Sequence, residues 1–153
     1  MNELTLRLGV KADHAVIVEY NHAMALETEH KRLDFDVLSA GVAAVFDDPS
    51  KGFYLVAERA GEVVGQLMVT TEWSDWRNGW FWWIQSVYVH PRARRQGVFR
   101  ALFREVERVA KTRMNVIGLR LYVEKENVAA QGTYRSLGMD DAGYLVFEMT
   151  PLG

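Results

Sequence analysis

The stretch SVYVHPRARRQGVFRALF, residues 86–103, joins a β-branched and aromatic segment to an apolar helical one through a basic loop. Four arginines, at positions 92, 94, 95 and 100, surround Gly97 in this stretch. The first amides of a helix have no intrahelical partner and carry partial positive charge, so this end of a helix favours an anion. Glycine lets an anion approach the backbone, and arginine supplies paired donors suited to phosphate. The order strand, glycine loop, helix favours a phosphate site over a merely solvated basic loop.

Composition limits the classes of protein to consider. The chain has 153 residues, 49% of them apolar and 25% charged, which predicts one compact domain over residues 1–153. Its formal net charge of −2 argues against nucleic acid as a partner. Cysteine is absent, which excludes a disulfide framework, a thiolate nucleophile and a cysteine–zinc site. The four histidines lack tight metal-ligand spacing, so we expect no metal.

The distribution of apolar residues predicts a cytoplasmic protein that does not bind membranes. No apolar run approaches the roughly 20 residues that span a bilayer. The N-terminal segment MNELTLRLGVKAD carries charges throughout and lacks the continuous apolar segment of a signal peptide.

Hydrophobic periodicity predicts the element order β-α-α-β-β-β-α-β-α-β, an α/β or α+β fold around a mixed sheet. Strands are expected over residues 4–10, 53–60, 62–73, 80–90, 117–124 and 143–150. Helices are expected to begin after Asp13, Asp34, Gly97 and Asn127. Asp13, Asp34 and Asn127 are suited to cap their helices, and Gly138 is suited to a left-handed helix end.

The basic stretch resembles the central motif of the GCN5-related N-acetyltransferases, the GNAT superfamily. That motif has a V-x-V strand, then R/Q-x-x-G-x-G/A, then a helix, and Phe99 stands where the family usually has glycine or alanine. The segment ENVAAQGTYRSLGM, residues 126–139, is similar to the N-x-x-A-x-x-x-Y-x-x-x-G-[FM] segment of the same family. It matches at Asn127, Ala130, Tyr134, Gly138 and Met139.

The resemblance implies a single GNAT-like domain with a mixed, mostly antiparallel sheet flanked by about four helices. It also implies acetyl-CoA as acyl donor, held where strands 80–90 and 117–124 splay apart. The pyrophosphate would rest on the amides of residues 95–98, with added charge from two arginines, and the pantetheine arm would pair with backbone groups of the first strand. The implied cofactor-binding residues are Val87, Tyr88, Val89, Arg94, Arg95, Gln96, Gly97, Val98, Phe99, Arg100, Asn127 and Tyr134.

For the reaction, the resemblance implies acetyl transfer to a primary amine of a small or peptidyl acceptor by direct attack on the thioester. Tyr134 matches the family's general acid, and the less favoured alternative is that it packs its helix onto the sheet. Many relatives carry a glutamate base where this chain has Gln85, and an amide cannot accept that proton. Glu72 and Asp75 are the alternative bases, and either could instead be a solvated hairpin charge.

The acceptor cleft of the family is walled by the first two helices, their connection and the hairpin before the central strand. Glu27 and Glu29 fall in that connection, where carboxylates would attract a cationic amine. Trp73 and Trp76 flank the hairpin turn, where an aromatic face could contact an ammonium group, and Gln85 would line the cleft. Ordinary surface charge and cross-strand packing are the alternatives for these residues.

Other functions remain open from the sequence. The missing glutamate at Gln85 fits a non-catalytic acyl-CoA-binding module, and the acyl group could differ from acetyl. A nucleic-acid contact through the arginines is the least favoured hypothesis. The last expected strand could also pair across a homodimer.

Overall fold

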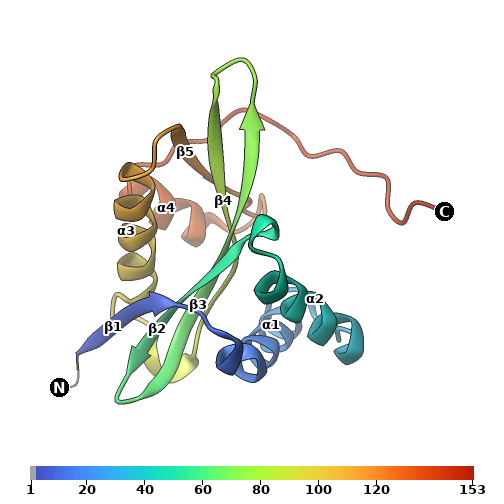
Figure 1. Cartoon of the computed structure of the whole chain (residues 1–153), viewed down its shortest axis with the longest axis vertical. Coiled ribbons are helices and arrows are strands. Elements are labelled where there is room, and N and C mark those ends of the chain that lie inside the picture. Colours follow the sequence, from blue (N-terminus) through green and yellow to red (C-terminus); the bar gives the residue numbers. More distant parts are fainter. Residues whose placement is uncertain (1–2) are drawn as a thin grey trace. The chain divides into compact units, whose positions relative to one another are not determined.

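A computed structural model of the chain describes residues 3–153 (Figure 1). Its contacts define two compact units, one ending at Tyr122 and one running from Val123 to Gly153, and each is described by itself. The first unit contains the sheet and three long helices, and the second contains one helix. One domain over residues 1–153 stays a prediction.

The first unit is built on five strands in the spatial order β1-β2-β3-β4-β5. Neighbouring strands from β1 to β4 are antiparallel, whereas β4 and β5 are parallel. The prediction of a mixed, mostly antiparallel sheet is therefore confirmed. The strands are β1 (Leu4–Leu8), β2 (Phe53–Arg59), β3 (Glu62–Ser74), β4 (Gly79–Val89) and β5 (Val116–Leu121).

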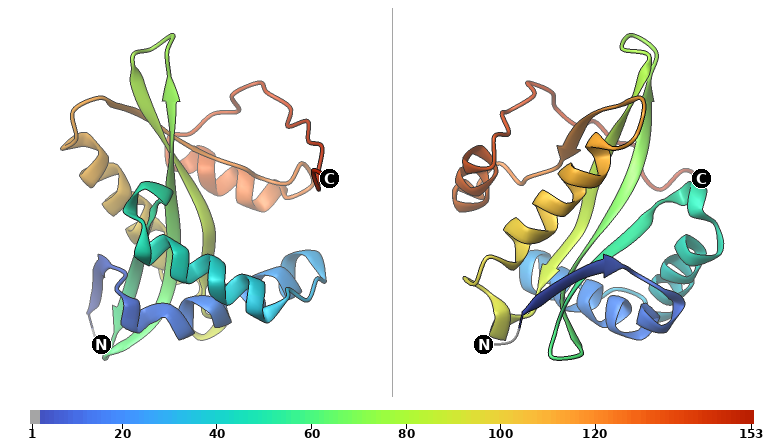
Figure 2. Two further views of the ribbon diagram at one scale, coloured as in Figure 1. Left: turned by 45° about the vertical axis from the view of Figure 1, so that its right-hand side comes forward. Right: turned by 60° about the vertical axis from the view of Figure 1, so that its left-hand side comes forward.

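Helices cover both faces of this sheet (Figure 2). They are α1 (His14–Glu29), α2 (Phe35–Asp47) and α3 (Val98–Lys111), with short 3-10 turns at Lys11–Asp13, Pro49–Lys51 and Pro91–Ala93. No helix within residues 3–153 combines the length and apolar character that a membrane span requires.

Alternation along β3 defines the two faces of the sheet. Met68 packs against a cluster of Ile17, Val18, Val42 and Tyr54, so from Gln66 onward the even-numbered residues of β3 lie on the face of α1 and α2, the α1/α2 face. Gly65 lies on the opposite α3 face, where an added Cβ would come within 2.8 Å of the Val98 side chain. This glycine lets the first turn of α3 lie close to the sheet.

Several predicted helix ends are confirmed. The Asp34 side chain accepts a hydrogen bond from the Val37 amide and caps α2. In the second unit, Asn127 accepts from the Ala130 amide at the start of α4 (Val128–Ser136). That helix ends with Gly138 at φ +99° and with the Met139 amide donating to the Tyr134 carbonyl, as in a Schellman motif.

Asp13 does not cap α1 with its side chain, contrary to the prediction. Its carboxylate accepts hydrogen bonds from Arg7 Nη1 at 2.8 Å, Arg7 Nη2 at 2.9 Å and the Val10 amide at 2.8 Å. A bidentate, charge-assisted pair is stronger than a neutral cap bond, so the aspartate turns toward β1. This buried carboxylate joins the first strand to the start of the first helix.

The strand expected over residues 143–150 is not present. Residues 143–150 have no regular secondary structure, and β5 is the last strand of the sheet that the described residues form. The exposed fractions of Tyr144, Leu145, Val146 and Phe147 are 69%, 68%, 65% and 90%. Alternation determines which side chains share a face, but a strand also needs a ladder with a neighbouring strand, and the sheet of the described residues consists of β1 to β5 without this segment.

Replacing Asp13 by asparagine should destabilise the protein by roughly 1–3 kcal/mol, because the part-buried Arg7 guanidinium loses its bidentate carboxylate and keeps only Glu58 as an ionised partner. Arg7 lowers the pKa of Asp13, so the stabilisation should be full above the unfolded pKa of about 3.9 and should disappear as pH falls through the lower folded value. Urea unfolding of both proteins between pH 7 and pH 3 measures this. If the difference in unfolding free energy between wild type and Asp13→Asn does not decrease in acid, the stabilising role of the Arg7–Asp13 pair is contradicted.

Candidate active site

The loop between β4 and α3 presents a row of backbone amides. After the turn at Pro91–Ala93, Arg95 and Gly97 have φ values of +61° and +78°, and α3 begins at Val98. Within residues 3–153, the amides of residues 95–98 donate to no other group. Alternating left-handed residues turn successive amides toward one side, an arrangement that binds anions. The loop for which a phosphate site is predicted thus forms an unpaired amide cradle, residues 95–98, and phosphate binding there stays a prediction.

The arginines of the loop divide into two kinds. Arg92 pairs with Glu62 at 2.7 Å and Arg94 pairs with Glu27 at 2.8 Å. Arg95 and Arg100 form no ion pair with any carboxylate of the described chain, so their charge remains available to an external anion.

Gln96 holds the loop from within. Its Oε1 accepts from Arg59 Nη1 at 2.5 Å, and its Nε2 donates to the Arg92 carbonyl at 3.0 Å. Sequence patterns do not identify Arg59 as part of the site, because it lies on β2, 37 positions from Gln96, and nothing in its local pattern points to the loop.

Arg94 links the loop to α1. Its Nε donates to the Val89 carbonyl at 2.8 Å, and its Nη2 donates to Glu27 Oε2 at 2.8 Å. Glu27 Oε1 also accepts from the Tyr88 hydroxyl at 3.2 Å. The Arg94 guanidinium lowers the pKa of Glu27, which keeps this carboxylate ionised. Two residues predicted for different parts of the site, Arg94 and Glu27, therefore contact each other.

The strands separate beside this loop. The register of β4 with β5 runs from Trp80 opposite Val116 to Ile84 opposite Leu121, and β4 continues to Val89 without a β5 partner. A bulge follows at once, because Gln66 lies opposite Tyr88 and Met68 opposite Gln85. Ser86, inside the bulge, has φ +53°. The predicted splay of the two strands is thus located at residues 85–89.

Gln85 and the predicted base Glu72 share the α1/α2 face but are apart. Gln85 Nε2 donates to Thr70 Oγ1 at 2.6 Å. Glu72 Oε1 accepts from Trp83 Nε1 at 2.9 Å and from Arg120 Nη1 at 3.3 Å. Glu72 lies opposite Phe81, four residues before Gln85, which is a separation of about 13 Å along the strand. An ion-paired carboxylate at that distance is a poor candidate for a base at the bulge.

The other predicted acceptor residues are dispersed. Asp75 Oδ1 accepts from the Trp76 amide within the hairpin turn, and Trp76 is 89% exposed. Trp73 packs edge-to-face on Trp80 with ring centroids 5.0 Å apart, on the α3 face and not on the face of Gln85. Glu29 pairs with Lys31 at 3.6 Å. The structure does not bring these side chains together with Gln85.

The second unit holds the remaining predicted residues. Tyr134 is half-buried on α4, and this burial raises the pKa of its phenol, so the group is neutral at pH 7. Asn127 is engaged in capping the same helix. Their roles toward a cofactor stay predictions.

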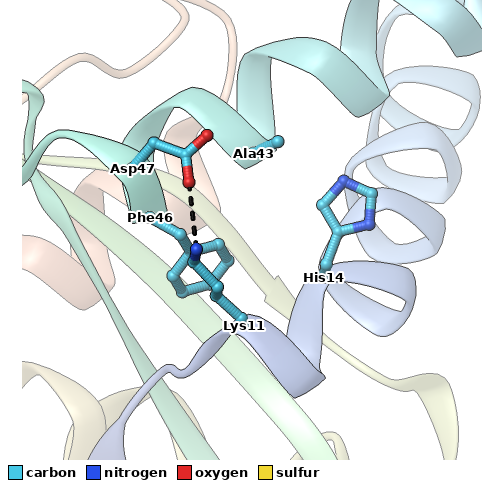
Figure 3. Close-up of a pocket in the computed structure, with 5 residues that line it drawn as sticks. All are labelled: Lys11, His14, Ala43, Phe46 and Asp47. Atoms are coloured by element: carbon cyan, nitrogen blue, oxygen red, sulfur yellow. Dashed lines mark ion pairs between the residues drawn. The ribbon is translucent and has the colours of Figure 1, made fainter.

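A cavity of about 280 Å³ lies elsewhere, between the start of α1 and the end of α2 (Figure 3). It is lined by Lys11, His14, Ala43, Phe46 and Asp47, and a 3.2 Å ion pair joins Lys11 to Asp47. None of the predicted site residues lines it.

Comparison with known proteins identifies the class to which this fold and loop belong. The sequence profile described as Acetyltransferase (GNAT) family matches residues 17–139. The chain belongs to this acetyltransferase family, as the two motifs predicted. No curated protein matches the chain.

Three solved structures illustrate the similarity. A possible acetyltransferase from Clostridium difficile 630 is 45% identical, with 98% of this chain and 99% of that chain covered and a TM-score of 0.92. A predicted acetyltransferase with acetyl-CoA from Clostridium acetobutylicum is 15% identical, with 95% and 96% covered and a TM-score of 0.77. AAC(6')-Iy in complex with the bisubstrate analog CoA-S-monomethyl-acetylneamine is 17% identical, with 98% and 99% covered and a TM-score of 0.76. The last two share the fold.

Gly97→Ala should destabilise the protein by roughly 1–2 kcal/mol, because φ +78° is unfavourable for any residue with a Cβ. Beyond the adjoining backbone, no atom lies within 4 Å of the added methyl group, so the loss should come from the backbone conformation alone. Gly132→Ala inside α4 is the matched control and should be neutral or stabilising. Chemical unfolding measures the stability of both variants. If Gly97→Ala and Gly132→Ala change the free energy of unfolding equally, the positive φ of Gly97 does not account for the loss.

Proposed function

We propose that this protein transfers the acetyl group of acetyl-CoA to a primary amine of a small or peptidyl acceptor. The observation that carries the proposal is the amide cradle, residues 95–98, next to the place where β4 leaves β5. A helix N-terminus with unpaired amides and two unneutralised arginines suits a diphosphate. An adjacent strand segment that has left β5 suits an extended arm that carries amides.

The cofactor would be bound in two parts. The diphosphate would rest on the amides of residues 95–98, with charge from Arg95 and Arg100. The pantetheine arm would lie along β4, where Val87 and Val89 face away from β3, since the His90 amide bonds to Val64 on β3 and successive residues face opposite sides. Arg94 would act mainly by holding the loop, because its donors are engaged with the Val89 carbonyl and Glu27.

The reaction would proceed by direct attack of a neutral amine on the thioester carbonyl carbon. A C–N bond forms, the C–S bond breaks, and the leaving thiolate takes a proton while the amine loses one. Tyr134 would supply the proton to sulfur, and its raised pKa keeps it protonated at neutral pH. A backbone amide near the bulge would stabilise the oxyanion.

The general base and the acceptor site are proposed from carboxylates on the β3–β4 hairpin and at the end of α1. Glu72 and Asp75 remain the carboxylates to test, although Glu72 is held by Arg120 and Trp83. The acceptor amine would approach the α1/α2 face near Gln85, with the ionised Glu27 at the end of α1 attracting its positive charge. The bisubstrate complex of AAC(6')-Iy suggests a small-molecule amine as one acceptor to test.

A non-catalytic acyl-CoA-binding module is the second candidate. Gln85 favours it, because its amide is hydrogen-bonded to Thr70 and cannot serve as a base. Release of thiol in the presence of any amine separates the two candidates, and a panel of acyl-CoA donors tests the acyl group.

Gly97→Glu should weaken acetyl-CoA binding at least about a hundredfold, because it adds a negative charge at the anion site. Calorimetric titration measures this effect. Gly41→Glu is the matched control, since it adds the same charge on α2 at an exposed glycine with open space around it. Wild-type protein that shows no saturable binding would overturn the acetyl-CoA proposal.

Tyr134→Phe should lower kcat about a hundredfold and change the KM for acetyl-CoA by less than about twofold, because only the acid is removed. Thiol release with the best amine of a panel reports the rate. Tyr144→Phe, at a tyrosine that is 69% exposed, is the control. An unchanged kcat would rule Tyr134 out as the acid.

A further inference from the structure

Gln66 is a buried polar residue in the middle of β3. Its exposed fraction is 0%, and it lies opposite Tyr88 on the α1/α2 face. Its Nε2 donates a hydrogen bond of 3.1 Å to the carbonyl of Ser86. A completely buried amide side chain is uncommon, so the group that it contacts requires an explanation.

The contacted carbonyl belongs to the bulge of β4. Ser86 has φ +53°, a region that a residue with a Cβ adopts only when its surroundings hold it there. In a bulge the extra residue leaves the ladder, so its carbonyl needs a donor from elsewhere. Gln66 supplies that donor from the neighbouring strand.

The carbonyl oxygen of the same amide side chain is energetically unfavourable. Gln66 Oε1 is buried and has no hydrogen-bond partner among the described residues. A methionine of similar length would fill the space without an unsatisfied acceptor. The stabilising contribution of this amide therefore comes from its bond to Ser86.

We propose that Gln66 is the positioning residue that fixes the bulge at Ser86 and thereby aims the backbone groups of Val87 and Val89 at the acyl-pantetheine arm. This inference rests on the proposed function. The register of β4 with β5 ends at Ile84, two residues before Ser86, so the bulge sets the direction of the part of β4 that leaves β5.

The arrangement separates the two halves of the cofactor. Gln66 bonds to β4, whereas the amide cradle is held by Arg59, Gln96 and the start of α3. Loss of the Gln66 donor should disturb recognition of the arm and leave recognition of the phosphates intact.

The test measures the affinity of wild type and Gln66→Met for two ligands by calorimetry. One is acetyl-CoA, and the other is adenosine 3′-phosphate 5′-diphosphate, which is the cofactor without its pantetheine arm. Gln66→Met should weaken acetyl-CoA binding about tenfold, the value of one hydrogen bond, and change nucleotide binding by less than about twofold. Val106→Ala, a buried substitution in α3, is the control for general destabilisation and should not split the two ligands.

Gln66→Glu provides a second variant that retains the shape of the side chain. A neutral carboxylic acid has an O–H donor for Ser86 and a carboxylate has none, so its acetyl-CoA affinity relative to wild type should be higher at about pH 6 than at about pH 8. This pH dependence, absent from Gln66→Met, would not arise from a packing defect.

The outcomes are distinct. If wild type binds both ligands, and Gln66→Met weakens both equally or weakens neither, the role of Gln66 is overturned and the proposed function is not. Failure of wild-type protein to bind acetyl-CoA overturns the proposed function and this inference with it.

Discussion

The rest of the site depends on the point at which β4 stops pairing with β5. Up to Ile84 the two strands form a parallel ladder, and from Gln85 onward β4 is paired only with β3. The bulge at Ser86 follows this point directly, and the strand then leads into the loop of unpaired amides. A sheet that remained paired would have used the same backbone groups internally, so the separation of the strands is what makes them available to a ligand.

Much of the fold could be predicted because its signals are local. Asp34, Asn127 and Gly138 each act within a few residues of their own position, and each ends or begins a helix as predicted. Asp13 differs because Arg7, six residues away in another element, competes for its carboxylate. The segment 143–150 differs because alternation describes a strand's faces and not its neighbour.

The site shows the same division between local and distant contacts. The amide cradle follows from a strand, a glycine and a helix in sequence, and the structure contains it where predicted. The pairing of Arg94 with Glu27 spans 67 positions and that of Arg120 with Glu72 spans 48, so neither could be read from spacing. These distant ion pairs affect the candidate roles, because in each of them a carboxylate is neutralised by an arginine that local sequence spacing does not reveal.

The hairpin of β3 and β4 has a spectroscopic consequence. All five tryptophans lie between Trp73 and Trp83, on these two strands and their turn. Trp83 shares the α1/α2 face with Gln85, whereas Trp73 and Trp80 lie on the other face. The tryptophan fluorescence of the protein therefore originates in a single hairpin whose inner end adjoins the bulge. Tryptophan emission from this chain can report on that region without an added label.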